Sequence, residues 1–392
     1  MIWQFVQNLE AYFECESVYE ISSNPPKPSS WYRRGMSMKG LVLAAGRGTR
    51  LRPLTHTRPK HLFRIAGKPI IHYALENLRE AGIREVGIVV SPYNKEDFQL
   101  SLNDFPGIDL EYIVQEEALG LAHAVGVARE WLDGSPFVLY LGDNLFQRGI
   151  TPFTQAFQPG VSAVIALVKV SDPRQFGVAV LDPQGRVVRL LEKPKDPPSD
   201  LAVAGVYVFG PEIMEVIAAL KPSARGEYEI TDAIQGLIDR GREVLGREIE
   251  GWWKDTGRPG DLLDANRLLL VEQPSPLPVL KGHVSDSQIT GRVVVEEGAV
   301  VRNSTILGPA HIAAGAHVES AYIGPFTSVG PGATVRRAEV EFSILEEAAT
   351  LEDVPLRLHE CILGVGAKVG SRNGLPRAHK LVLGDLSSVE LG

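Results

Sequence analysis

The segment Leu41–Lys60 combines a glycine turn with several positive charges. Gly46 and Gly48 follow an apolar run, and Arg50 and Lys60 follow the two glycines. Glycine lets backbone N–H groups approach an anion without interference from a Cβ atom, and the cations add full charge. A ligand with several adjacent anionic oxygens fits this arrangement, so the segment predicts a triphosphate site.

Two well-known phosphate-binding motifs are absent from the sequence of this segment. A Walker A loop requires Gly-x4-Gly-Lys-Ser/Thr, and no such run occurs. A dinucleotide fingerprint requires a third glycine, but Leu51 occupies that position. The segment therefore predicts a different way of holding phosphate.

Two aspartates could hold a metal ion: Asp143 in "LGDN" and Asp255 in "WKDTG". Mg²⁺ prefers such carboxylate oxygens and keeps several waters. Each aspartate alone also has a simpler interpretation. Gly-Asp-Asn is a common turn, and Asp255 could cap the helix that follows it.

The elements that must position these residues alternate between strands and helices. Short runs rich in Val, Ile and Leu occupy residues 40–45, 85–91, 110–114 and 136–141. Such runs are typical of strands buried on both faces of a parallel sheet. The segments 68–82 and 120–132 have helical patterns, and Pro69 and Gly82 mark the ends of the first. The alternation predicts an α/β fold.

Polar clusters follow three of the four strands. The glycine-arginine loop comes after the first, "QEEALG" after the third, and "GDN" after the fourth. Ligands of open α/β sheets bind at the carboxyl ends of the strands. We therefore expect one site to collect all three clusters.

A different pattern begins after the proline-rich residues 272–283. Aliphatic residues recur every six positions and, after one slip, resume the same period; they are Val294, Val300, Ile306, Ile312, Val318, Ile323, Val329 and Val335. Small residues stand four positions after several of these: Ser304, Ala310, Ala316, Thr327 and Ala333. This period predicts the coils of a parallel β-helix. The pattern weakens over residues 341–360, which we interpret as an irregular coil or an insertion, and residues 372–392 as a cap or tail.

The N-terminal domain resembles the sugar-phosphate nucleotidylyltransferases. "LAAGRGTRLRPLTHTRPK" is similar to the signature of that family, Gly-x-Gly-Thr-Arg with Pro-Lys downstream. "VQEEALGLAHA", "LGDN", "LLEKPK", "AGVYVF", "ARGEYEITDAI" and "GWWKDTGRPGDLLDANR" are most similar to the long-form glucose-1-phosphate thymidylyltransferases within it.

The resemblance implies a fold and a reaction. The fold is α/β, with a Rossmann-like nucleotidyltransferase domain whose sheet is mixed but mostly parallel, followed by a left-handed parallel β-helix. The reaction is Mg²⁺-dependent transfer of a nucleotidyl group from dTTP, or alternatively UTP, to glucose 1-phosphate. The resemblance further implies a cytoplasmic homo-oligomer.

Carried over one residue at a time, the resemblance also implies site residues. Those for the nucleotide are Gly46, Gly48, Thr49, Gln115 and Gly120. Those for the sugar phosphate are Gly177, Glu192, Lys193, Gly205 and Arg225. Arg50, Lys60 and Lys193 are the implied catalytic cations, and Asp143 and Asp255 the implied Mg²⁺ ligands.

These roles agree with the physical chemistry of the reaction. A sugar 1-phosphate is largely dianionic at neutral pH because its second pKa is about 6, so it needs no strong general base. Bringing two polyanions together is the difficulty, and positioning with charge neutralisation overcomes it.

Two other functions remain open at this stage. The β-helix could be an acetyltransferase, as in bifunctional amino-sugar enzymes, and His311, His317, Asn303 and His359 are its candidate residues. Oligomerisation or stabilisation is the simpler role. The chain could also be a non-catalytic assembly subunit, but the intact motifs argue against that interpretation.

Composition limits the remaining choices. The 392 residues carry a net charge of −8, which gives no general electrostatic reason to bind nucleic acid. Two cysteines cannot form a disulfide framework, which favours a reducing cytoplasm, and no apolar run approaches the roughly 20 residues that span a membrane. We expect an N-terminal extension without catalytic purpose (1–37), a nucleotidyltransferase domain (38–271), a linker (272–283) and a β-helix (284–392). A short docking helix is the alternative for residues 1–37.

Overall fold

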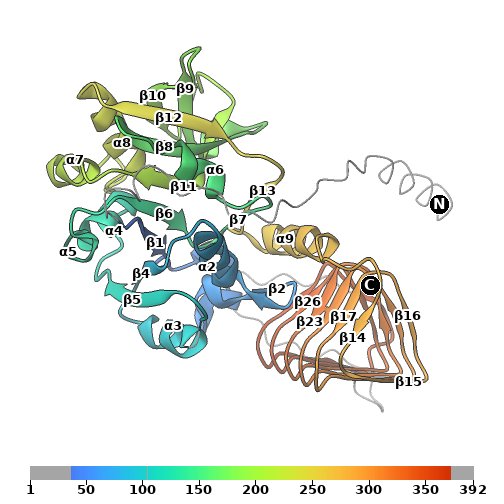
Figure 1. The fold of residues 1–392 in the computed structure, drawn as a ribbon. Helices are drawn as coiled ribbons and strands as arrows, with labels where there is room; N and C mark the ends of the chain where they lie inside the picture. The colour runs from blue at the N-terminus through green and yellow to red at the C-terminus, as the bar shows by residue number, and fades with distance from the viewer. Residues whose placement is uncertain (1–36, 104, 372–392) are drawn as a thin grey trace.

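The computed structural model describes residues 37–103 and 105–371 (Figure 1). The expected N-terminal extension, apart from Ser37, and the expected cap or tail at 372–392 lie outside the described residues. Among the described residues, none of the helices combines the length and apolar character needed to cross a membrane.

The N-terminal domain is built on a nine-stranded sheet with the order β10-β9-β11-β6-β1-β4-β5, to which β8 and β12 are joined beside β11. Four neighbouring strands run in parallel: β1 (Lys39–Leu43), β4 (Glu85–Val90), β5 (Asp109–Val114) and β6 (Phe137–Leu141). The other strands are β8 (Val161–Lys169), β9 (Gly177–Leu181), β10 (Val187–Glu192), β11 (Leu201–Phe209) and β12 (Glu243–Glu248), of which β8 and β12 also pair in parallel. All four strands predicted from the apolar runs are confirmed, and they form the continuous parallel run β6-β1-β4-β5 of this sheet.

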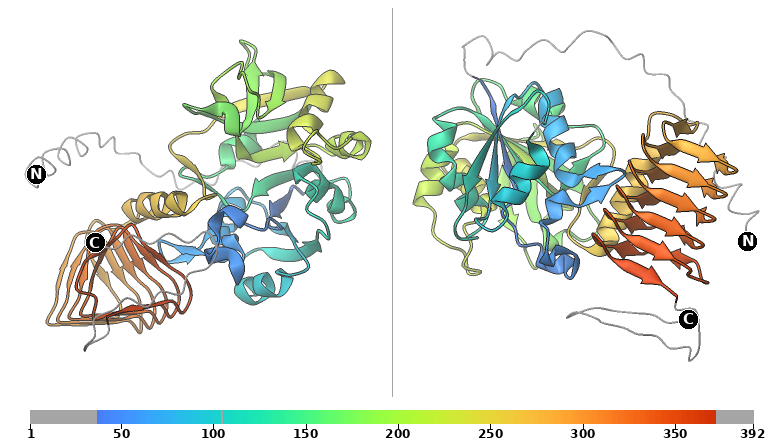
Figure 2. Two further views of the ribbon diagram at one scale, coloured as in Figure 1. Left: turned by 180° about the vertical axis from the view of Figure 1, so that it is seen from behind. Right: turned by 90° about the horizontal axis from the view of Figure 1, so that it is seen from below.

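Helices cover the sheet on both faces (Figure 2). They are α2 (Ile70–Glu80), α3 (Lys95–Leu102), α4 (Leu121–Val127), α5 (Arg129–Leu132), α6 (Thr151–Ala156), α7 (Ile213–Ala219) and α8 (Ile230–Asp239). The predicted helix after Pro69 is α2, and Gly82 ends it with a φ of 87° that disfavours other residues. The second helical pattern is divided between α4 and α5.

The loop between β1 and α2 is unusually long and has little regular structure. It contains three short 3-10 turns, η2 (Thr49–Leu51), η3 (Leu54–His56) and η4 (Lys60–Leu62). A small hairpin, β2 (Arg64–Ile65) and β3 (Lys68–Pro69), follows it. A second small pair, β7 (Asn144–Phe146) and β13 (Trp253–Asp255), lies off the main sheet and leads into α9 (Pro259–Val271).

The remaining strands form a parallel β-helix of three sheets, consistent with the left-handed β-helix that we expected. The first sheet contains β14 (Val279–Leu280), β17 (Val293–Val295), β20 (Ala310–Ile312), β23 (Thr327–Val329), β26 (Ile344–Leu345) and β29 (Ile362–Leu363). The second contains β15 (His283–Ser285), β18 (Val300–Arg302), β21 (His317–Glu319), β24 (Thr334–Arg336), β27 (Thr350–Glu352) and β30 (Lys368–Gly370). The third contains β16 (Gln288–Thr290), β19 (Thr305–Leu307), β22 (Tyr322–Ile323), β25 (Glu339–Glu341) and β28 (Leu358–His359). The predicted fold class is confirmed.

The core of the β-helix differs in phase from the expectation at its beginning. Val293 and Val295 of β17 and Val301 of β18 are buried, whereas Val294 and Val300 are only partly buried. The reason is that the coils at the start of the β-helix take 17 residues rather than 18, since Val293 pairs with Ala310 and Ala310 pairs with Thr327. One of the three steps in such a coil therefore spans five residues.

The short step falls at the corner between the second and third sheets. Asn303, Ser320 and Arg337 occupy this corner in successive coils, with φ values of 45°, 50° and 48°. A left-handed residue turns the chain tightly, which removes one position from the repeat. The expected small residues, from Ser304 to Ala333, are all buried. Residues 341–360 are more regular than we expected: the coils continue through β26 to β28, with extra residues only between β27 and β28.

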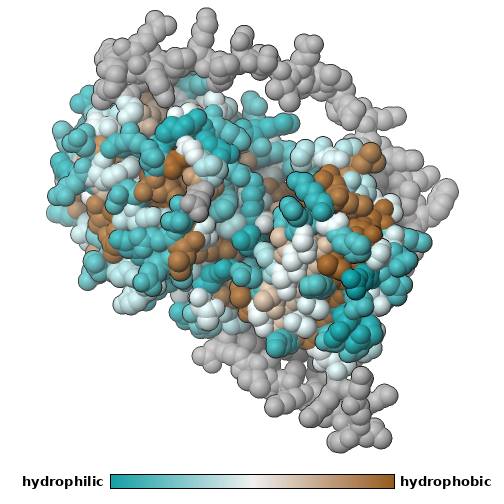
Figure 3. All heavy atoms as spheres, turned by 60° about the horizontal axis from the view of Figure 1, so that its bottom comes forward, coloured by the Kyte–Doolittle hydropathy of each residue, from teal (hydrophilic) through white to brown (hydrophobic). Residues whose placement is uncertain are grey.

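One face of the β-helix is covered by the N-terminal domain. Every residue of β20 and β23 is buried, whereas β21 in the second sheet exposes His317 and Glu319. Helix α9 and the hairpin β2–β3 lie against this first sheet, as the view from below shows (Figure 2). The two domains touch directly in the space-filling view (Figure 3).

Candidate active site

The glycine loop after β1 presents an open surface. Gly46 is exposed, and a Cβ atom added there would meet nothing within 4 Å. Gly48 adopts a φ of 60°, and its carbonyl accepts a 2.8 Å hydrogen bond from the Thr55 hydroxyl. Thr49 and Arg50 are exposed beside it. The loop therefore leaves its backbone amides and one guanidinium available for an anion.

Lys60 and Asp143 form an ion pair at the carboxyl end of β6. Asn144 also donates from Nδ2 to the Asp143 Oδ1 atom, at 2.9 Å. Burial alone would raise the pKa of Asp143, but the Lys60 ammonium and this hydrogen bond outweigh burial and hold the pKa below its ordinary value. The carboxylate is thus charged and oriented before any ligand binds.

Asp255 is brought to the same place by the small pair of strands. In this ladder Asp255 lies opposite Asn144, and the Thr256 N–H donates to the Asp143 carbonyl at 3.1 Å. Burial and the nearby Asp143 charge raise the pKa of Asp255 to about 6. The structure therefore gathers two carboxylates that are 112 positions apart in the sequence, Asp143 and Asp255.

Arg50 approaches Asp255 across Gly257. A Cβ atom at Gly257 would lie 3.3 Å from Arg50 Nη2 and 3.3 Å from Asp255 Oδ2. The glycine leaves room between a cation and an acid that come from opposite ends of the domain. Helix α9 begins after Arg258, and no side chain caps it. The alternative interpretation of Asp255, as the cap of this helix, is therefore wrong.

The two aspartates fit a divalent cation. Both offer only oxygen, and a cation would relieve the repulsion that raises the pKa of Asp255. In residues 37–103 and 105–371, however, no three or more His, Cys, Asp or Glu side chains gather in a metal-binding group. The remaining ligands would therefore be substrate phosphates and water, as is usual for Mg²⁺.

A second cluster surrounds Glu192 at the end of β10. Its carboxylate accepts from the Thr231 hydroxyl at 3.0 Å and from Arg225 Nη2 at 3.1 Å. Arg225 also donates to Glu229 at 2.8 Å, so acids surround its guanidinium. Gly177 lies opposite Glu192 in the ladder, where a Cβ would be 2.6 Å from Thr231 Cγ2.

Lys193 stands next to this cluster in a strained conformation. Its φ of 41° lies in the left-handed region, which costs a residue with a Cβ about 1–2 kcal/mol. Its N–H donates to the Phe176 carbonyl at 3.0 Å, and its ammonium lies 3.4 Å from Glu192. Strain of this kind is typical of residues that a site holds in a fixed orientation.

Asn144 connects Asp143 to β11 and β13, and the sequence did not single it out. Its Oδ1 accepts from the Gly205 N–H at 3.2 Å and from Trp253 Nε1 at 2.8 Å, while its Nδ2 holds Asp143. A Cβ at Gly205 would lie 2.6 Å from the Asn144 amide. The "GDN" motif contains Asn144, but only the fold reveals its three partners.

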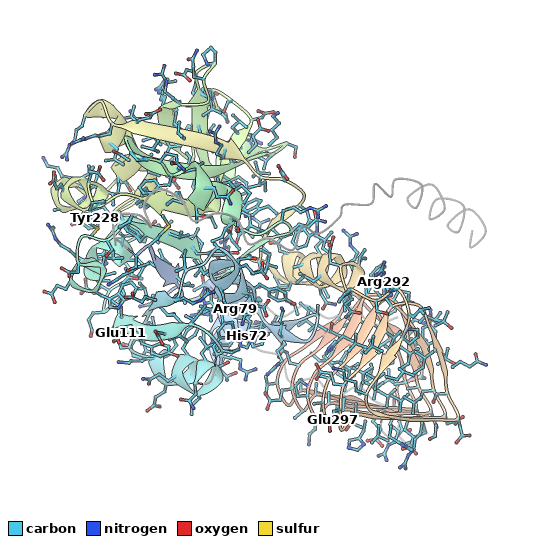
Figure 4. All side chains as sticks on the ribbon, in the orientation of Figure 1. His72, Arg79, Glu111, Tyr228, Arg292 and Glu297 are labelled. Atoms are coloured by element: carbon cyan, nitrogen blue, oxygen red, sulfur yellow. The ribbon has the colours of Figure 1, made fainter. Side chains whose placement is uncertain are left out.

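A third cluster lies at the end of β5. Gln115 is buried, and its amide Nε2 lies 2.9 Å from His123 Nδ1 on α4. Gly120 has a φ of 109°, and a Cβ there would lie 2.6 Å from the Tyr228 carbonyl. Figure 4 labels Tyr228 where it meets α4. Gln115 thus contacts α4 and Gly120 precedes it, and the binding of a nucleotide by these two residues stays a prediction.

The candidate acetyltransferase residues lie in unrelated environments. His311 is buried at the domain boundary, where its Nε2 lies 3.1 Å from Glu296 Oε1. His317 is exposed on the second sheet, and His359 contacts Glu341 on the third. Asn303 forms a corner and donates to Ser320. These side chains do not form one group.

Comparisons with known proteins agree with this geometry. Residues 39–272 match the family model described as nucleotidyl transferase. A glucose-1-phosphate thymidylyltransferase of Streptomyces antibioticus is 47% identical, covering 90% of this chain and 99% of that protein. The low-salt glycan biosynthesis nucleotidyltransferase Agl11 of Haloferax volcanii is 43% identical, covering 90% and 100%.

Comparison with solved structures gives the same result. A crystal structure of UDP-glucose pyrophosphorylase complexed with UDP-glucose is 28% identical, with a TM-score of 0.55, and covers 61% of this chain and 100% of that chain. The family match spans more than half of this protein, and the relatives match it at both domains. The chain belongs to the nucleotidyl transferase family.

Proposed function

We propose that this protein is a Mg²⁺-dependent glucose-1-phosphate thymidylyltransferase that makes dTDP-glucose and pyrophosphate from dTTP and glucose 1-phosphate. The observation that carries the proposal is the meeting of Lys60 with Asp143, beside Asp255 and Arg50. The name of the Streptomyces relative, which is similar over 90% of this chain, supports the choice of substrates.

The nucleotide is held from three sides in this proposal. Backbone amides of Gly46, Gly48 and Thr49 bind the triphosphate, because the open glycine loop lets oxygens come close. Gln115 hydrogen-bonds the edge of the pyrimidine. Gly120 lets the backbone before α4 pack closely against the backbone of Tyr228.

The sugar phosphate occupies the cluster around Glu192. Glu192 binds sugar hydroxyls. Gly177 and Gly205 shape the pocket by letting Thr231 and Asn144 pack against the strands, because a Cβ atom at either glycine would lie 2.6 Å from these side chains. Arg225 is paired with acids, so its role is to orient the Glu192 carboxylate. Lys193 binds the sugar phosphate.

The reaction is a direct displacement. A phosphate oxygen of glucose 1-phosphate attacks the α-phosphorus of dTTP, a new P–O bond forms, and the bond to the bridging oxygen of pyrophosphate breaks. Lys60 neutralises the transferred phosphate and Arg50 the leaving pyrophosphate. Asp143 and Asp255 would hold Mg²⁺, which supplies charge neutralisation at the phosphate oxygens.

The proposal is tested by incubating the protein with Mg²⁺, glucose 1-phosphate and each nucleoside triphosphate in turn, while pyrophosphate release is measured. We expect the highest kcat/KM with dTTP. A preference for UTP would correct the nucleotide only, since one methyl group distinguishes the two bases and is worth about 1–3 kcal/mol. No release with any pair of substrates would reject the function.

We also propose that the protein is a homo-oligomer. In the part of the chain that the structure describes, the N-terminal domain covers the first sheet of the β-helix, whereas the third sheet leaves Tyr322 and Arg357 in a partly exposed cation–π contact at 4.5 Å. Size-exclusion chromatography with light scattering measures the mass of the protein in solution. A monomer at micromolar concentration contradicts the proposal.

A further inference from the structure

One charged residue of the β-helix contacts the phosphate-binding loop directly. Glu346 follows β26, and none of its side chain is exposed. Its Oε1 accepts a 2.7 Å hydrogen bond from the Arg64 N–H, and its Oε2 lies 3.8 Å from Arg58 Nη1. Lys60 lies between these two positions in the chain. Glu346 therefore holds the loop on both sides of the lysine that pairs with Asp143.

Apolar contacts fasten the same loop to the same part of the β-helix. Leu51 is fully buried in a cluster that includes Ile344, and Leu54 packs against this cluster together with Phe342. Helix α9 supplies further apolar residues to the cluster. The middle of the loop thus rests on the β-helix, while its two ends face the substrates.

A second polar contact secures the hairpin that follows the loop. Asn266 of α9 is fully buried and accepts from the Ala66 N–H at 2.8 Å and from the Ser328 hydroxyl at 2.6 Å. Gly67 packs so closely on His311 that a Cβ would lie 2.4 Å from the imidazole. The boundary between the domains is therefore specific rather than a general apolar contact.

Burying a carboxylate at the contact between two domains carries a large desolvation penalty. Burial raises the pKa of Glu346 to about 7, although the Arg64 N–H and the Arg58 charge oppose the shift. An apolar side chain of similar volume at such a position is often as stabilising or more so. A role in orienting the loop explains why a charge stands there.

We propose that Glu346 is a positioning residue for nucleotidyl transfer, which holds the loop Gly46–Phe63 through Arg58 and the Arg64 amide so that Lys60 and Arg50 meet the triphosphate. The inference rests on the proposed function for its substrates. In this proposal the β-helix contributes to the active site by positioning the loop that carries Lys60 and Arg50. It also assigns Arg58, one of the motif cations that phosphate binding alone does not use.

The test compares Glu346→Gln with Glu347→Gln. Glutamine keeps the acceptor for the Arg64 N–H and removes the charge that attracts Arg58. Glu347 contacts the same Arg58 at 3.4 Å but is 47% exposed, so its removal is a matched control. At pH 8 we expect E346Q to lower kcat/KM for the triphosphate about 10- to 100-fold without lowering Tm, and E347Q to change it less than about twofold.

Amide hydrogen exchange without substrate separates this inference from the proposed function. Peptides from residues 46–63 should exchange faster in E346Q than in the wild type and E347Q. If wild-type protein releases no pyrophosphate, the function fails, but the exchange result still tests the contact. Unchanged exchange in E346Q overturns the inference.

A second variant covers the case in which E346Q is unstable. Arg58→Gln removes the same attraction from the more exposed partner, which is 29% exposed, and should fold. We expect the same faster exchange and the same loss of kcat/KM, with little further loss in the double variant because the two residues act as a pair. If R58Q leaves both quantities at wild-type values, the inference is wrong.

Discussion

Lys60 donates to the carboxylate of Asp143, although 83 residues separate them in the chain. The loop after β1 supplies the cation, and the end of β6, which pairs with β1 in parallel, supplies the acid. Because a buried charge is costly without its partner, each residue holds the other in place before substrate arrives.

Asp143→Asn and Asp255→Asn should each lower pyrophosphate release at least about 100-fold, because an amide cannot replace a charged metal ligand. Far-ultraviolet circular dichroism should show that both variants remain folded. Asp264→Asn is the control, since Asp264 pairs with Lys254 and Arg267 rather than with Lys60 or Arg50. Near-normal turnover of either variant at ordinary Mg²⁺ would contradict the metal assignment.

Gly46→Ala should impair binding of triphosphate without affecting stability. The added methyl group meets no protein atom within 4 Å, so Tm should stay constant, but it occupies the approach of the phosphate oxygens. We expect KM for the triphosphate to rise about tenfold, a loss of about 1.4 kcal/mol. Gly260→Ala is equally uncrowded and should change neither Tm nor KM.

Gly67→Ala should destabilise the protein more than Gly82→Ala. Both glycines have a positive φ, 95° and 87°, so both variants carry a conformational cost of about 1–2 kcal/mol. Only at Gly67 does the new methyl group also collide with His311. Equal shifts in the denaturant midpoint would show that the hairpin does not pack on His311 as described.

Glu346 should make the wild type less stable as pH rises. Its folded pKa of about 7 exceeds the ordinary value of 4.5, so the folded state binds more protons between these values. The contribution of Glu346 protonation to the free energy of unfolding is complete below pH 4.5. It falls by about 1.4 kcal/mol per pH unit until pH 7. The stability of E346Q relative to wild type should therefore increase from pH 5 to pH 8, and a flat difference contradicts the shift.

The sequence could predict residues that follow strands, because strand ends share one edge of a parallel sheet. Gly46, Gln115 and Asp143 are of this kind, and the structure brings the loops that carry them to that edge. Asp255 could be found only through its motif, since β13 pairs with β7 rather than with the main sheet.

Contacts across long sequence separations could not be predicted. Asn144 has three partners from three elements, and Arg58 finds its acids nearly three hundred residues away. The phase of the β-helix also escaped prediction, because Val294 and Val295 are equally apolar and only the corner geometry decides which one points inward.

The 17-residue coil has a consequence for the evolution of this protein. Solenoids commonly gain or lose whole repeats, because each repeat contacts only its neighbours. Here the loss of one coil between β17 and β26 would displace Glu346 along the axis by about 4.8 Å, the spacing of adjacent strands. That displacement exceeds the 2.7 Å and 3.8 Å separations by which Glu346 holds the loop. The number of coils before Glu346 is therefore tied to the position of the loop that carries Lys60.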